Sequence, residues 1–320
     1  MSSPIDTLEP ASVWAHFDTL CRIPRPSKHE DALRDHLLAW ARARADSHGL
    51  RARVDAAGNL VIRKPGTPGH EQAPVLALQG HLDMVTQKAS GSPHDFMKDP
   101  IRAVVEDGWL RAPETTLGSD NGIGVALTLA LLESTDVPHG PLEALFTVDE
   151  EAGMGGAQGL EAGSLQARLM LNLDTTGRGA AGSESIIVSG IADLVPWFKH
   201  LSARHAYRLE VQDRFTSSSD HFSFAMAGVP SANVGTSETT AAAQGLVGRG
   251  WGHTVADTFD KANPKGLQSA SMVAAWVLAA AADATDWPVT RQSPAEIEAQ
   301  LRATGMLDEL VASGRWPSKR

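Results

Sequence analysis

The apolar run at residues 75–78 constrains the fold more than any other stretch, because it leads directly to His81 and Asp83. A short apolar run between Pro74 and Gly80 is typical of a strand that is buried on both faces of a sheet. In open α/β sheets, ligands bind beyond the carboxyl ends of such strands. His81 and Asp83 share one face of an extended segment, so the carboxylate can orient the imidazole. The run therefore predicts a site at the end of a buried strand.

Size and charge narrow the class of protein. The 320 residues, 42% of them hydrophobic, suffice for a full core. The net charge is −10 and there is no basic run, so nucleic acids and membranes are poor partners. The single cysteine excludes an internal disulfide and a cysteine-rich zinc site. The chain starts without a signal-peptide pattern and no apolar run reaches the ~18 residues of a membrane span, so we expect a cytoplasmic location.

Apolar spacing predicts alternating helices and strands, which favours an α/β fold. Ser27 is expected to cap a helix over about 28–47, and a capping box at Ser293 and Glu296 predicts a last helix to about residue 313. Further helices are predicted at 11–21, 125–132 and 267–284, and further strands at 142–148 and 168–173.

Acidic and imidazole side chains follow these strands or lie in glycine-bounded loops. The candidates are His81, Asp120, Glu150, Glu151, Asp174 and His253. Two imidazoles and several carboxylates without a thiolate suit a pair of hydrolytic zinc ions, with one carboxylate between the metals and one free as a base. Burying six such groups without a metal would carry a large desolvation cost.

Several motifs resemble those of known metallopeptidases. Four of them are similar to the Xaa-His dipeptidase branch of the aminoacylase-type metallopeptidases: residues 79–85 (QGHLDMV), 115–122 (TTLGSDNG), 139–143 (HGPLE) and 146–151 (FTVDEE). The later part resembles the zinc aminopeptidases related to bacterial leucyl aminopeptidase, through residues 172–178 (NLDTTGR), 219–224 (SDHFSF), 228–230 (GVP) and 253–258 (HTVADT).

The two families share one catalytic-domain fold. The resemblance implies a single three-layer zinc-exopeptidase domain of the phosphorylase/hydrolase-like kind over residues 1–320, with a central mixed sheet flanked by helices. Residues 290–320 would form a C-terminal helical extension. The dipeptidase branch carries a separate lid and dimerisation domain, but the interval from Asp174 to His253 holds only the catalytic fold itself. We therefore expect no lid domain, and a monomer or a homodimer.

The resemblance also implies a role for each candidate. Asp120 would bridge two Zn²⁺ ions, with His81 and Asp174 on one ion and Glu151 and His253 on the other. Glu150 would be the base that takes a proton from the attacking water and later gives it to the leaving amine. Asp83 would orient His81, and a cis peptide bond would follow Asp120. Co²⁺ or Mn²⁺ are possible substitutes for zinc.

One position departs from the aminopeptidase pattern. These enzymes place an oxyanion-stabilising tyrosine three residues before the Ser-Asp-His run, and Thr216 stands there in this chain. The dipeptidase branch uses a lid histidine instead. Ser217, Ser218 and His221 are further candidates for this donor, and His221 is equally a candidate for a structural role.

The six candidate residues and the resemblance together imply a dinuclear zinc exopeptidase, either an aminopeptidase or a dipeptidase. Such an enzyme hydrolyses short peptides with a free amino terminus. Two alternatives stay open. The same machinery cleaves other amides, which would suit an N-acyl-amino-acid deacylase. The missing tyrosine and lid would suit a non-catalytic relative that binds metal.

Overall fold

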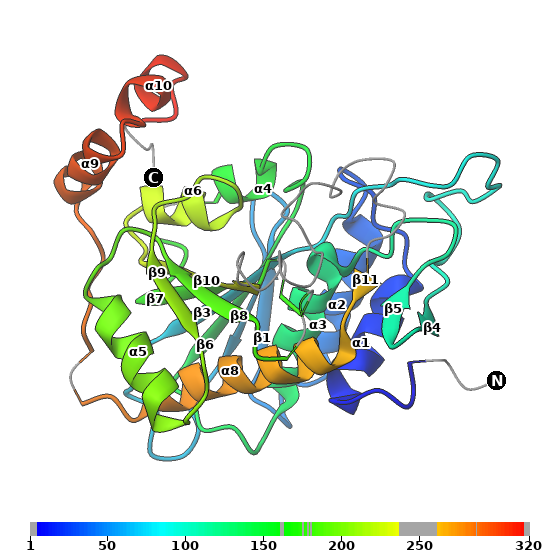
Figure 1. Cartoon of the computed structure of the whole chain (residues 1–320), viewed down its shortest axis with the longest axis horizontal. Helices are drawn as coiled ribbons and strands as arrows, with labels where there is room; N and C mark the ends of the chain where they lie inside the picture. Colours follow the sequence, from blue (N-terminus) through cyan, green and yellow to red (C-terminus); the bar gives the residue numbers. More distant parts are fainter. Residues whose placement is uncertain are drawn as a thin grey trace.

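The computed structural model describes residues 5–160, 163–174, 176–177, 179, 181–236, 261–285 and 287–316. Its centre is an eight-stranded sheet (Figure 1). In spatial order the strands are β1 (Arg51–Val54), β2 (Leu60–Lys64), β6 (Leu142–Thr147), β3 (Leu76–His81), β7 (Leu169–Asn172), β10 (Ser231–Thr236), β8 (Glu184–Val188) and β9 (Glu210–Asp213). A small second sheet contains β11 (Lys261–Ala262), β5 (Trp109–Arg111) and β4 (Val104–Glu106).

The sheet is mixed, as predicted. Strands β6, β3, β7 and β10 run parallel to one another, whereas β1, β2 and β8 pair antiparallel with their neighbours toward the centre. Strand β3 is buried at all six positions, which confirms the strand expected before His81. Because parallel strands end at the same edge, the loops after β3, β6 and β7 come together there.

Helices cover both faces of this sheet. They are α1 (Ala11–Cys21), α2 (Asp31–Arg42), α3 (Ser119–Glu133), α4 (Gly155–Gln158), α5 (Leu194–Arg204), α6 (His221–Met226) and α8 (Pro264–Ala282), whereas α9 (Pro294–Ala303) and α10 (Leu307–Ala312) pack against α6. Leu76 and Leu78 of β3 belong to the core with α1, α2, α3, α5 and α8, whereas Ala77 belongs to a smaller core with α4 and α6. This alternation gives three layers, because successive side chains of a strand point to opposite faces.

Three helix predictions were wrong in extent. Helix α3 begins at Ser119 and not at about residue 125, because glycines expected to precede it lie within its first turns. Helix α2 covers only Asp31–Arg42, and Ser27 does not cap it, because its hydroxyl donates to Asp83. The last predicted helix is divided into α9 and α10, since Gly305 between them has a φ of +74°. The predicted capping box of Ser293 and Glu296 is present at the start of α9.

Helices α9 and α10 lie beyond α6 at the upper left of Figure 1. Their apolar side chains pack against Phe222 and Met226 of α6. It stays a prediction that residues 1–320 form one catalytic domain in which residues 290–320 are a C-terminal helical extension. Within the described ranges, no helix combines the length and apolar character needed to cross a membrane.

Lys64 of β2 lies under the end of α3 and gives a pH prediction. Its Nζ donates to the carbonyl oxygens of Ser134 and Leu131, at 2.7 and 3.4 Å. Burial lowers the pKa of Lys64 from 10.5 to about 8. Between these two values the unfolded chain binds more protons than the folded protein, so the free energy of unfolding rises with pH. We expect wild type to gain roughly 2 kcal/mol relative to Lys64→Met between pH 8 and pH 10.

Urea denaturation of both proteins at the two pH values measures this gain. Lys98→Met is the control, because the Lys98 side chain is 78% exposed. An equal pH dependence of wild type and Lys64→Met would contradict the prediction.

Candidate metal centre

Five predicted ligand and base residues meet at the carboxyl edge of the central strands. His81 is the last residue of β3, and Asp120 lies in the first turn of α3. Glu150 and Glu151 follow β6, and Asp174 follows β7. The sixth candidate, His253, lies outside the described residues.

The imidazole of His81 lies between two groups of carboxylates. Ligand atoms of His81, Asp120 and Asp174 all lie within 4.8 Å of one another, and so do those of His81, Glu150 and Glu151. The Nε2 atom of His81 is 3.1 Å from an Asp120 oxygen and 3.9 Å from a Glu150 oxygen. The geometry thus brings Glu150 into the cluster together with the predicted ligands.

Asp83 contacts the Nδ1 side of the His81 ring, whereas the Nε2 side faces Asp120. Nδ1 of His81 lies 3.3 Å from the Asp83 carboxylate and 3.1 Å from the Asp83 carbonyl oxygen. The same carboxylate accepts hydrogen bonds from the backbone N–H groups of Glu150 and Glu151, at 3.0 and 3.1 Å, and from the Ser27 hydroxyl at 2.7 Å. Asp83 therefore joins the loop after β3 to the loop after β6, a link that the sequence motif did not reveal.

The acids of the cluster differ in pKa. Burial alone would raise the pKa of Asp83, but hydrogen bonds from His81, Ser27 and the Glu150 N–H outweigh it and lower the pKa to about 2. Burial and nearby negative charge instead raise the pKa of Glu150 to about 9, of Glu151 to about 8 and of Asp174 to about 7. Bringing such carboxylates together favours protonation or a cation.

These residues fit a divalent metal. The Oδ1 atom of Asp174 is buried without a hydrogen-bond partner among the described residues. Oxygen and imidazole nitrogen donors are ligands that zinc accepts, and a cation would offset the repulsion between the buried acids. The peptide bond between Asp120 and Asn121 is cis, as the resemblance implied.

Comparisons with known proteins identify the family. Residues 59–278 match the model of Peptidase family M28. The chain belongs to this family. It is also 45% identical over 177 residues to the cytosol non-specific dipeptidase of Escherichia coli (strain K12), covering 55% of this chain and 36% of that protein.

Solved structures extend the comparison of this M28 chain. The aminoacylhistidine dipeptidase of Vibrio alginolyticus is 47% identical to this chain. The match covers 58% of this chain and 36% of the dipeptidase chain, with a TM-score of 0.53. A tripeptidase from Staphylococcus aureus shares the fold at 15% identity, with a TM-score of 0.63 over 87% of this chain and 100% of its own. The chain spans about a third of the length of the two dipeptidases.

A buried polar network lies beneath the cluster in this M28 chain. The backbone N–H of Asp174 donates to the side-chain oxygen of Asn172 at 3.1 Å, and Asn172 in turn donates to Gln79. Gln79 donates to the buried carboxylate of Asp220 at 2.8 Å. The sequence does not indicate this pairing, because Gln79 and Asp220 lie 141 residues apart.

The oxyanion candidates form a group of their own. The Thr216 hydroxyl lies 2.7 Å from Nε2 of His221. His221 is buried, and burial lowers its pKa to about 4, so its imidazole is neutral near pH 7. Ser217 and Ser218 are exposed in the same loop.

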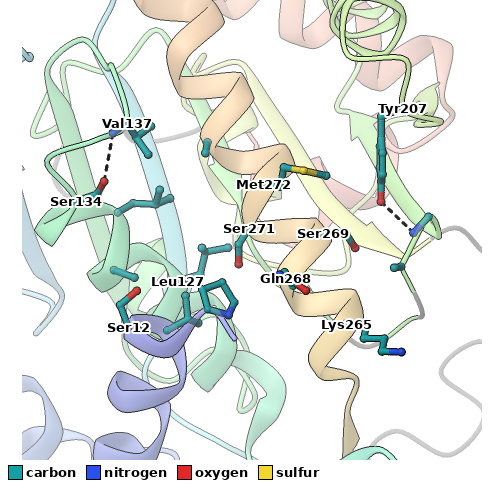
Figure 2. A pocket seen from close by; sticks show the side chains of 17 residues that line it. Ser12, Leu127, Ser134, Val137, Tyr207, Lys265, Gln268, Ser269, Ser271 and Met272 are labelled. Carbon is teal, nitrogen blue, oxygen red and sulfur yellow. Dashed lines mark hydrogen bonds between the residues drawn. The ribbon is translucent and has the colours of Figure 1, made fainter. Parts of the chain in front are cut away.

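A separate groove of about 850 Å³ lies between α3 and α8. Figure 2 shows Ser134 and Val137 on one side of α8 and Tyr207 on the other, whereas Lys265 projects from the first turn of α8 itself. Its lining is mainly apolar, and no residue of the carboxylate cluster contributes to it. The groove is therefore distinct from the candidate metal centre.

Proposed function

We propose that this chain is a dinuclear zinc exopeptidase that hydrolyses the peptide bond of short peptides with a free amino terminus, as an aminopeptidase or a dipeptidase. The observation that carries this proposal is the convergence of His81, Asp120, Glu150, Glu151 and Asp174 at one buried edge of the sheet. Membership of a peptidase family and the names of the two dipeptidase relatives support it.

The proposed ligand sets are those that the resemblance implies. His81 and Asp174 would hold one ion, Glu151 and His253 the other, and Asp120 both. When bound, zinc supplies the Lewis acidity that lowers the pKa of water to roughly 7 and polarises a carbonyl group. Co²⁺ and Mn²⁺ are substitutes to test in the same sites.

The remaining chemistry falls to side chains of this chain. Glu150 would accept a proton from the attacking water as the water oxygen bonds to the peptide carbonyl carbon. When the carbon–nitrogen bond breaks, Glu150 would return that proton to the leaving amine. Asp83 would hold Nδ1 of His81, so that Nε2 faces Asp120, and would hold the backbone of Glu150 in register.

We further propose a short peptide as the substrate, with neither nucleic acid nor membrane as a partner. The protein would act in the cytoplasm as a monomer or a homodimer. The name of the E. coli relative, a cytosol dipeptidase, supports this location.

Mass spectrometry of products tests the proposal. The zinc-loaded protein is incubated with dipeptides, some of which end in histidine, with longer free peptides, with N-acetylated peptides and with N-acyl amino acids. We expect cleavage of free peptides only. Stepwise loss of the first residue would identify an aminopeptidase, and cleavage restricted to dipeptides would identify a dipeptidase. Loss of acyl groups alone would make it a deacylase, and no product at full metal occupancy would exclude catalysis.

A further inference from the structure

Arg25 is a buried cation that contacts two loops of the metal centre. Its side chain is packed into the protein, with 2% of the residue exposed. Nη1 donates to the carbonyl oxygens of Leu82 at 2.9 Å and Asp83 at 3.0 Å. Nη2 donates to the carbonyl oxygen of Gly118 at 2.5 Å. One planar guanidinium thus binds three backbone oxygens.

These oxygens belong to the segments that position two of the proposed ligands. Leu82 follows His81 at the end of β3, whereas Gly118 lies two residues before Asp120 at the start of α3. The Met84 N–H also donates to the Arg25 carbonyl oxygen, at 3.2 Å. The fixed fork of an arginine sets both the distance and the direction of its acceptors, which a flexible ammonium does not.

Two glycines leave the space that the guanidinium fills. A Cβ atom on Gly122 would lie 2.7 Å from Nη2 of Arg25 and 3.0 Å from the ring of Phe17. A Cβ atom on Gly118 would lie 2.5 Å from the same Nη2. The glycines on either side of Asp120 are therefore explained in part by the arginine that packs against them.

We propose that Arg25 is a positioning residue, which holds the loop of His81 and the loop of Asp120 at the separation at which both side chains bind one metal ion. This inference rests on the proposed function, because it requires that the cluster binds metal. Arg25 itself is assigned no contact with the metal or the substrate. Its effect passes through backbone carbonyls, so it is expected in metal affinity and coordination geometry rather than only in folding.

The test compares metal binding by Arg25→Met, Arg25→Lys and wild type. Competition with a chelator gives the zinc Kd, and the visible absorption of the Co²⁺-loaded protein reports the coordination geometry. We expect a zinc Kd about 10- to 100-fold higher for Arg25→Met, with a changed cobalt spectrum and partial rescue by lysine. The control is Arg44→Met, since Arg44 donates to Glu133 and to the Trp40 carbonyl oxygen, away from the cluster.

Gly122→Ala provides a second variant if Arg25→Met does not fold. Its methyl group displaces the guanidinium, so we expect weaker zinc binding in the same direction. In the double variant with Arg25→Met the two effects should not add, because they act on one contact.

Two negative results have different meanings. Wild-type Kd and an unchanged cobalt spectrum in the folded Arg25 variants, with only a lower unfolding temperature, would overturn the positioning role and leave the proposed function intact. A wild-type protein that binds no zinc would overturn the proposed function and this inference with it.

Discussion

We expect Glu150→Gln to lower kcat by about 10³-fold, since a positioned general base contributes 10²- to 10⁴-fold and an amide cannot take its place. Zinc content should stay at the wild-type level, because the proposed base is not a ligand. The fold should persist, since glutamine has nearly the same size and shape as glutamate. Steady-state kinetics on a peptide found by product analysis, together with metal analysis, measures both quantities.

The neighbouring Glu151 supplies the matched comparison. Glu151→Gln should lose zinc, because Glu151 is the proposed ligand, although both carboxyls lie within the same group around His81. Loss of zinc from Glu150→Gln with retention by Glu151→Gln would exchange the two roles. Full turnover by Glu150→Gln would exclude it as the base.

We expect the second large effect from Asp120→Ala. Asp120 lies 3.1 Å from Nε2 of His81 and is the proposed bridge between both ions. Its removal should reduce zinc to one ion or none per chain. Activity should fall by at least about 10³-fold, because a catalytic metal supplies several kcal/mol and each 1.36 kcal/mol is a factor of ten in rate. Metal analysis at buffered free zinc and kinetics measure the two effects.

The control for this variant is Asp136→Ala. Asp136 is exposed in the loop after the C-terminal end of α3, whereas Asp120 lies in the first turn of that helix. Removal of the Asp136 carboxylate should therefore change neither the zinc content nor the rate of peptide hydrolysis. Two tightly bound zinc ions in Asp120→Ala would contradict the bridging role.

Much of the fold was predictable from local patterns. The apolar run of β3 predicted a strand buried on both faces, and the capping box of Ser293 and Glu296 predicted the start of α9. Local chemistry alone misled where a residue had a distant partner. Ser27 has the residue type and position of a helix cap, yet its hydroxyl binds Asp83, 56 residues away in sequence.

The candidate site divides in the same way. The sequence determined the residue types, because imidazole and carboxylate groups follow buried strands or lie between glycines, and the motifs around them indicated which to choose. The sequence did not indicate which other residues hold these side chains in place. Arg25 contacts Leu82 and Gly118, which follow it in the sequence by 57 and 93 residues. Asp83 accepts a hydrogen bond from Glu150, which follows it by 67 residues.

By itself, the sequence determined the strand that leads to His81, the acids that follow β6 and β7, and the glycines around Asp120. Only the tertiary structure decided that β3 lies between β6 and β7, so that their loops share one edge, and that Arg25 and Asp83 connect these loops. The physical reason is that apolar periodicity and turn chemistry act between near neighbours, whereas hydrogen bonds between loops depend on strand order, which no local pattern encodes.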